Sequence, residues 1–122
     1  MKNFETLKKA MQVNPAQVNS YLQHAARYSE RYNLEVLTFD ELPWAGDADG
    51  RIAEIVDQLK QFGITEFWIA ESSTALNKAL IRLMQWGITI TGGEFLKVPS
   101  PTFSWNEDIP VIKCRIGGND ND

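Results

Sequence analysis

The sequence predicts a single α/β domain in which three helices pack on a mixed sheet of about four strands. Amphipathic helical segments alternate along the chain with short runs of branched and aromatic residues. Two of these helical segments end in the same pattern, Gln-aromatic-Gly-Ile-Thr, at 61–65 and at 85–89. The length of 122 residues is also typical of one domain. We expect the domain to span 1–116 and residues 117–122 to form a disordered acidic tail.

Helices in the first third of the chain are predicted from apolar residues that recur every three or four positions. Residues 3–12 have this spacing and are expected to form a short helix. A longer helix is predicted over 15–32, because Asn14 is a favourable N-cap and Pro15 suits the first helical turn. Asn33 is expected to end this helix, since asparagine tolerates the left-handed conformation.

Two further helices are predicted in the central part of the chain. Residues 51–62 carry an apolar stripe opposite charged residues, and Asp49 is expected to cap the start of this helix. Gly63 is placed for the left-handed turn that ends it. The next helix is predicted over 74–86, and Gly87 is expected to end it in the same way.

The predicted strands are rich in branched and aromatic residues. They cover 34–39, 65–70, 88–91, 94–98 (after a bulge at Gly92-Gly93) and 109–116. Because two helix–strand units follow each other, we expect 65–70 and 88–91 to lie side by side as parallel strands. The last strand, 109–116, is expected to form an antiparallel hairpin with 94–98. Pro110 places this strand at a sheet edge or near its own start, because proline cannot donate a ladder hydrogen bond.

Composition argues against several classes of protein. Twelve Lys and Arg against sixteen Asp and Glu give a net charge of −4, which disfavours sequence-independent binding to nucleic acid. The single cysteine, Cys114, excludes an internal disulfide and fits a reducing compartment. The sequence has no apolar run of the ~20 residues that span a bilayer, and its start lacks the apolar region of a signal peptide. We therefore expect a cytoplasmic protein with no membrane contact.

A stretch in the second half of the chain resembles a known family. The segment 63–73 (GITEFWIAESS) is followed by a helix, by Trp86-Gly87, by a strand and by Gly92-Gly93-Glu94. This order resembles small α/β proteins of unknown function from Gram-positive gut bacteria, often encoded near plasmid or transposon genes. The resemblance covers about 51–98. It departs at 71–74, where Glu-Ser-Ser-Thr replaces a Ser-Ser-x-Trp-like turn. The resemblance implies a fold and a genetic context, and no reaction.

One candidate ligand site lies where the predicted parallel strands end. Ligands of open α/β sheets bind in the crevice outside the carboxyl ends of the strands. Here these ends carry Glu71, Ser72, Ser73 and Glu94. Free N–H groups at the helix start after Ser72 and Ser73 would suit a carboxylate or phosphate. The alternative is a plain helix cap, which the absence of a glycine-rich loop or a following lysine favours.

No residue pattern predicts a reaction. His24 is the only histidine, so it has no second histidine with which to bind zinc. By strand alternation Cys114 shares a face with Ile112 and Ile116, which favours a buried thiol over a nucleophile. Strand-end carboxylates such as Asp40 and Glu41 are usually solvated or capping. The sequence therefore predicts no catalytic residue, no metal site and no cofactor.

A candidate partner site is formed by aromatic and acidic residues in predicted loops. These residues are Trp44, Asp47, Asp49, Phe103 and Trp105. Loop aromatics often anchor protein interfaces, although they can equally fold back over the sheet. We expect a partner with a basic, partly apolar groove, and a non-enzymatic accessory protein, for example a mobile-element inhibitor of a host defence complex. The alternative is a small-molecule or phosphate-binding protein, which could be an enzyme, that uses the strand-end crevice. A homodimer through the last strand, 109–116, is compatible with either function.

Overall fold

The computed structural model describes residues 2–43, 46–70 and 76–117. In chain order its elements are α1 (Glu5–Val13), a 3-10 turn (Pro15–Gln17), α2 (Ser20–Arg31), β1 (Thr38–Phe39), α3 (Ala48–Gln61), β2 (Glu66–Ile69), α4 (Leu76–Gln85), β3 (Ile88–Pro99) and β4 (Asn106–Ile116). Within these residues the four strands form one mixed sheet. The predicted fold class, a single small α/β domain with a four-stranded mixed sheet, is therefore confirmed.

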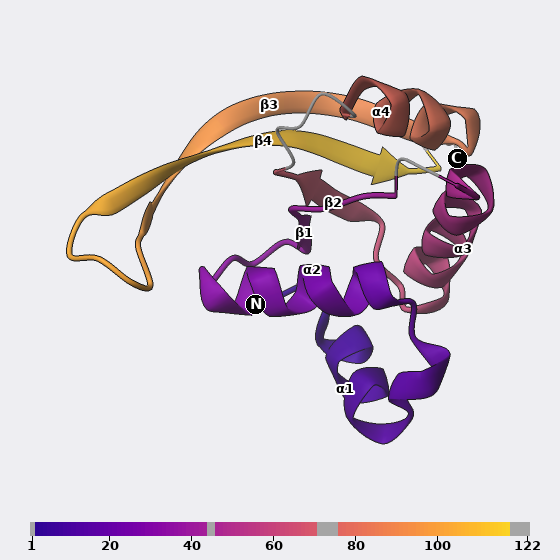
Figure 1. The fold of residues 1–122 in the computed structure, drawn as a ribbon, viewed down its shortest axis with the longest axis horizontal. Helices are drawn as coiled ribbons and strands as arrows, with labels where there is room; N and C mark the ends of the chain where they lie inside the picture. The colour runs from indigo at the N-terminus through magenta and orange to yellow at the C-terminus, as the bar shows by residue number, and fades with distance from the viewer. Residues whose placement is uncertain (1, 44–45, 71–75, 118–122) are drawn as a thin grey trace.

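The strand order of the sheet is β1-β2-β4-β3 (Figure 1). Strands β1 and β2 are parallel, and β4 is antiparallel to both of its neighbours. The expectation that β2 and β3 lie side by side is wrong, because Cys114 of β4 lies opposite Phe67 on one side and Ile90 on the other. Burial explains the order. Cys114 is fully buried at the centre, whereas the inner half of β3, with two glycines, is mostly exposed at the edge.

Strands β3 and β4 form a long hairpin that extends beyond the rest of the sheet. They pair from Ile88–Ile116 to Pro99–Asn106, as the predicted hairpin requires, whereas β2 reaches only as far as Ile112. Residues 94–111 therefore form a curved, two-stranded projection, here called the arm (Figure 1). The bulge was predicted at Gly92-Gly93 and instead falls at Thr91. Thr91 is the extra residue of β3 between Ile90 and Gly92, which pair with consecutive residues of β4.

Position in the arm also explains how β4 accommodates a proline. Pro110 lies opposite Phe95 of β3. In this part of β4, β3 is paired on one side and no described strand is paired on the other. The missing N–H of proline therefore interrupts no bond to a second strand, as expected for a strand edge. The inner half of β4 is paired on both sides over 112–115. This half of the last strand therefore has no free edge, because the edge strands of the described sheet are β1 and β3.

The helix predicted over 15–32 is divided in two. Val18 has an extended backbone (φ −106°, ψ 128°) that ends the 3-10 turn. Asn19 then caps α2, and its side-chain oxygen accepts a hydrogen bond from the Tyr21 N–H at 2.8 Å. Asn19 is thus the effective cap, whereas Asn14 makes no side-chain capping bond. The predicted left-handed conformation at Asn33 is confirmed, with φ of 56°.

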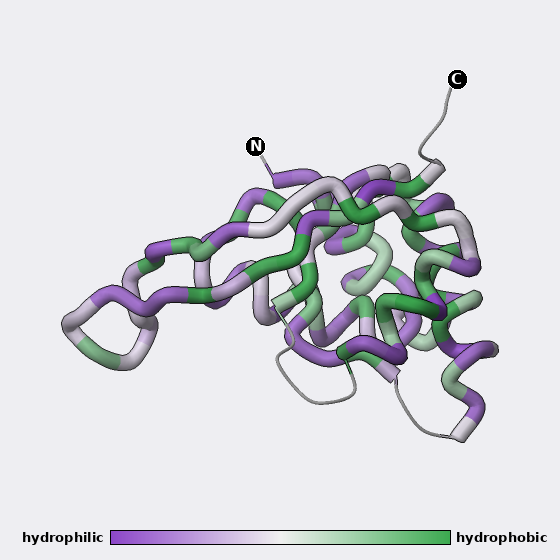
Figure 2. Tube along the Cα trace, turned by 90° about the horizontal axis from the view of Figure 1, so that it is seen from above, coloured by the Kyte–Doolittle hydropathy of each residue, from purple (hydrophilic) through white to green (hydrophobic). Residues whose placement is uncertain are grey.

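The core lies between the helices and the central strands. Hydrophobic stretches gather in the globular part of the molecule, and polar and apolar stretches alternate along the arm (Figure 2). Phe39 of β1 and Phe67 of β2 are fully buried and meet edge to face, with ring centroids 5.5 Å apart. The stripe predicted on α3 is buried and comprises Ile52, Ile55, Val56, Leu59 and Phe62.

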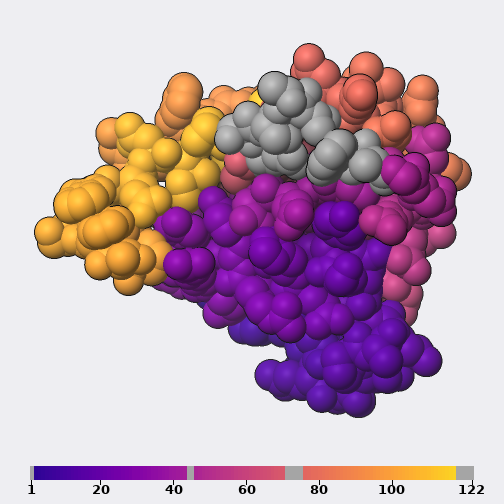
Figure 3. Space-filling view, in the orientation of Figure 1, coloured from indigo at the N-terminus to yellow at the C-terminus, as the bar shows by residue number. Residues whose placement is uncertain are grey.

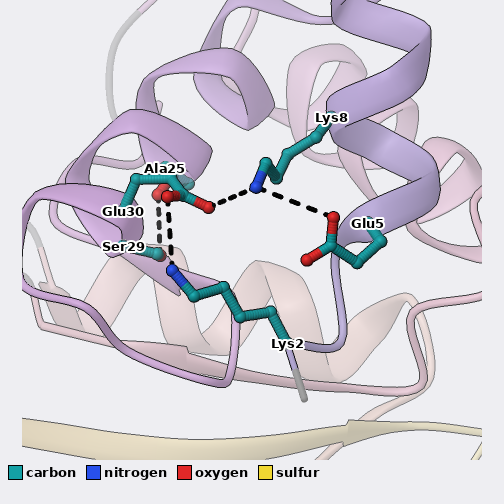
Figure 4. A network of polar contacts seen from close by, with 6 residues as sticks. All are labelled: Lys2, Glu5, Lys8, Ala25, Ser29 and Glu30. Carbon is teal, nitrogen blue, oxygen red and sulfur yellow. Dashed lines mark hydrogen bonds and ion pairs between the residues drawn. The ribbon is translucent and has the colours of Figure 1, made fainter.

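Ion pairs attach the N-terminal segment to α2 (Figure 4). Glu30 of α2 accepts from Lys8 Nζ at 2.7 Å and from Lys2 Nζ at 3.2 Å, and Lys8 also lies 3.6 Å from Glu5. The hydrogen bond from Lys8 lowers the pKa of the Glu30 carboxyl, and the same contact raises the pKa of Lys8. These groups are largely solvated, so they orient α1 on α2 more than they stabilise the fold.

Candidate functional site

The end of the arm presents two stacked aromatic rings to solvent. The rings of Phe103 and Trp105 lie 4.4 Å apart at an angle of only 5°. Their side chains remain 54% and 59% exposed, respectively. Both residues were predicted to bind a partner, and the structure stacks them together in the loop at the end of the arm. The arm projects from the rest of the molecule (Figure 3).

Local hydrogen bonds shape the loop that carries these rings. Ser100 Oγ accepts from the N–H groups of Thr102 at 3.1 Å and Phe103 at 3.0 Å. The backbone N–H of Ser100 also donates to the Trp105 carbonyl at 3.2 Å. A serine turn of this kind satisfies backbone groups that the hairpin ladder no longer reaches. The loop 100–105 therefore presents its aromatic pair on an internally bonded turn.

Polar contacts hold the arm against the body. Tyr32, the residue that ends α2, donates its phenolic hydrogen to Glu107 Oε1 at 3.2 Å. Burial, together with Glu107, raises the pKa of this phenol. Across the arm, Lys97 pairs with Asp108 at 3.0 Å. Sequence analysis missed the Tyr32–Glu107 contact, because the two residues are far apart along the chain.

Asp47 and Asp49, the acidic residues of the candidate partner site, make hydrogen bonds within the fold and lie far from the arm tip. Asp47 caps α3 and accepts from the Gly50 N–H at 3.3 Å, so it does the capping expected of Asp49. Asp49 instead accepts from Arg82 Nε of α4 at 2.9 Å. Helix α3 lies at the opposite end of the molecule from the arm tip (Figure 1). Trp44 lies outside the described residues. Of the described members of this set, Phe103 and Trp105 are brought together.

An apolar groove lies at the carboxyl end of β2. Its volume is about 550 Å³, and its described lining comprises Ile69, Leu76, Gly93, Glu94, Phe95, Pro110, Val111 and Ile112. Of the strand-end candidates, Glu94 lies here and forms an ion pair with Lys113 at 3.0 Å. Glu71, Ser72 and Ser73 lie outside the described residues. The described part of the lining holds no cation, so it favours an apolar ligand over a phosphate.

His24 has a carboxylate partner that sequence analysis missed. Its Nε2 atom lies 2.9 Å from Asp40 Oδ1 and 3.9 Å from Glu41 Oε1. A polar hollow of about 580 Å³ adjoins it, lined also by Arg51 and Glu54. Across the ranges 2–43, 46–70 and 76–117, no group of three or more His, Cys, Asp or Glu side chains is arranged to bind a metal.

The only cysteine is chemically protected. Cys114 is fully buried in β4, as strand alternation predicted. Burial in apolar surroundings raises the pKa of its thiol to about 12. A neutral thiol at neutral pH is a poor nucleophile, so Cys114 serves as a small core side chain.

We expect the stability of the protein to fall above about pH 9. The folded state keeps the Cys114 proton up to pH about 12, whereas an unfolded thiol ionises near pH ~8.5, so alkaline conditions favour unfolding. The loss reaches at most ~1.4 kcal/mol per pH unit for this group. Urea unfolding at several pH values should show a shallower decline for Cys114→Ala than for the unchanged protein. If the free energy of unfolding declined equally steeply with pH for the two proteins, the Cys114 thiol would not be the group responsible.

Comparison with known proteins gives a family. A family model described as "Domain of unknown function (DUF7698)" matches residues 22–115. No curated protein and no solved structure matches the chain significantly. No helix in the part of the chain that the structure describes is long and apolar enough to cross a membrane. Because the family model covers most of the sequence, this chain belongs to the DUF7698 family, whose function is unknown.

Proposed function

We propose that this protein is a non-enzymatic accessory protein that binds another protein through the tip of its arm. The stacked, exposed pair of Phe103 and Trp105 is the observation that carries the proposal. Large aromatic side chains are the commonest anchors of protein interfaces, because they bury much apolar surface and lose little conformational freedom. A pair already stacked in the free protein reduces the ordering cost of binding further.

The charges near the tip support a partner with a basic rim. Glu107 and Asp108 follow the aromatic loop after Asn106, and the only cation of the arm, Lys97, is already paired with Asp108. The net charge of −4 acts in the same direction. An apolar pocket with basic residues at its edge would bind the rings and attract the acidic surroundings. The same charges disfavour nucleic acid as the partner.

The resemblance to proteins encoded near plasmid and transposon genes suggests a biological setting. In that setting the partner would be a host protein, for example a component of a defence complex that the accessory protein inhibits. A cytoplasmic location is part of this proposal, and the single buried thiol supports it.

Replacement of Trp105 by alanine is expected to weaken partner capture at least about tenfold. The protein, immobilised on beads, would capture partners from lysate of its host, and mass spectrometry would identify them. The affinity of the recombinant partner for each variant would then be measured by calorimetry. The melting temperature should change little, because Trp105 is largely exposed and its ring stacks on the exposed ring of Phe103.

Two variants act as controls for this experiment. Val13→Ala removes another exposed apolar side chain, on α1, and should leave capture unchanged. Phe103→Ala should reproduce the loss, because it removes the ring on which Trp105 stacks. Full capture by both Trp105→Ala and Phe103→Ala would refute the proposal.

The apolar groove supports a second candidate function, the binding of a small molecule. Its volume of about 550 Å³ lies in the range of ligand sites. A thermal-shift screen with nucleotides, sugar phosphates, divalent ions and apolar compounds separates the two functions. A shift that is lost in Phe95→Ala, which removes a ring from the lining of the groove, and kept in Trp105→Ala would favour this candidate.

A further inference from the structure

The sheet ends in an unprotected edge. β3 is the outermost strand of the described sheet and pairs only with β4, so its outer backbone groups have no strand partner within that sheet. Proteins usually protect such an edge with charged side chains or proline. The segment from Trp86 to Gly93 contains neither a charged residue nor a proline. This edge is therefore open to pairing with another strand.

Exposed apolar side chains lie beside the same edge. Among the described residues, every exposed large hydrophobic side chain except Val13 falls between Ile81 and Trp105. Apart from the arm, these are Ile81, Met84, Trp86 and Ile90. They come from α4 and from the start of β3, where α4 packs on the sheet (Figure 1). Ile81 lines a hollow with Asp49 and Arg82, on the side of α4 that faces α3. The other three, Met84, Trp86 and Ile90, are here called the α4–β3 patch.

The orientation of α4 places Met84 on the side that faces away from α3. Arg82 contacts Asp49 of α3, so this flank of α4 is already covered. Met84 comes two residues later, which is about 200° around the helix. Met84 therefore lies on the flank that faces away from α3, toward the free edge of the sheet, and it is about half exposed.

We infer that the α4–β3 patch and the β3 edge together bind a second copy of this chain. An antiparallel pairing of β3 with its symmetry mate would continue the sheet across a two-fold axis, with the two α4 helices meeting on the same face. In such a dimer each residue near the axis lies close to its own copy, so a charge there would repel itself. The segment 86–93 and the exposed Met84 carry no charge.

A second copy would cover both the unpaired backbone of β3 and the exposed apolar side chains beside it. Strand pairing would bond the open backbone of β3, and the facing helices would remove Met84 and its apolar neighbours from water. The bulge at Thr91 limits straight pairing to the inner half of β3 and leaves the arm to curve away. The dimer would present two arm tips, although the inference does not depend on what the tips bind.

The test is the oligomeric state of three proteins. Sedimentation or light scattering between about 5 and 500 µM should show the unchanged protein approaching twice the mass of one chain. Met84→Lys places a charge near the axis and should raise the dissociation constant at least about tenfold. Val13→Lys, a matched change of an exposed apolar residue on α1, should behave as the unchanged protein does. Circular dichroism should show that both variants are folded.

Hydrogen exchange gives a second readout that reports the strand itself. Amide protons in 88–93 should exchange more slowly at high than at low protein concentration, and Met84→Lys should remove this difference. A monomer throughout the concentration range would overturn the inference. A dimer unaffected by Met84→Lys would also overturn it, as would one that dissociates in Trp105→Ala instead, because the contact would then lie at the arm tip.

Discussion

Replacement of Phe67 by alanine is expected to lower the free energy of unfolding by about 3–5 kcal/mol. Phe67 is fully buried in β2, packs edge to face on Phe39 of β1 and lies opposite Cys114 of β4. Its loss would leave a cavity that touches three strands, and a sheet cannot collapse easily to fill it. Urea unfolding followed by tryptophan fluorescence or circular dichroism measures the change.

Phe95→Ala is the matched control for this prediction. Phe95 is the same residue type in β3, but its side chain is 75% exposed. Its removal should change the free energy of unfolding by no more than about 0.5 kcal/mol. Similar losses for the two variants would show that Phe67 does not lie in the core as described.

The second large effect is expected from Ser29→Ala, which should cost about 1–3 kcal/mol. Ser29 of α2 is fully buried, and its Oγ accepts from the Thr38 N–H at 2.8 Å and donates to the Ala25 carbonyl at 2.8 Å. The hydroxyl thus replaces a strand partner on the outer side of β1. Alanine would leave the Thr38 N–H buried and unpaired, and its better helix propensity offsets at most about 0.5 kcal/mol.

The same unfolding measurement checks this prediction. Ser20→Ala, at the exposed start of α2, should be nearly neutral, since no hydrogen bond of the Ser20 side chain is found among the described residues. Ser29→Thr keeps a hydroxyl and should lose less than Ser29→Ala if the methyl group can be accommodated. A neutral Ser29→Ala would contradict the account of the β1 edge.

The elements of the fold were largely predictable because their causes are local. The stripe on α3 and the left-handed residues Asn33, Gly63 and Gly87 depend on neighbours within one or two turns. The break at Val18 was missed, because two competent caps, Asn14 and Asn19, lie five residues apart. Tertiary contacts favour the second of them, because Val18 packs into the core and the Asn19 N–H donates to Gln58 of α3.

The strand order could not be predicted from the helix–strand repeat. The pattern Gln-aromatic-Gly-Ile-Thr determines how each helix is connected to the strand that follows it. It contains no information on which other strand pairs with that strand. A hairpin strand can insert between two such units, and β4 does so because it brings the buried Cys114 to the centre. The outcome depends on contacts between residues far apart in the chain.

The candidate partner site was predictable only in part. That Phe103 and Trp105 lie in a loop follows from the flanking Pro, Ser and Asn residues. Their stacking follows from the Ser100 turn and from the length of the arm, which the sequence pattern underestimated. Asp47 and Asp49 illustrate the opposite case, since a helix cap and an ion pair account for both carboxylates.

The arm, the free edge of β3 and the exposed tip all depend on the position of β4 between β2 and β3. Cross-strand NOEs in an isotope-labelled sample measure this position directly. We predict backbone contacts that link Phe67 with Cys114 and Cys114 with Ile90, and none that link residues 66–69 directly with 88–91. Backbone contacts between 66–69 and 88–91, in the pattern of adjacent parallel strands, would contradict the account.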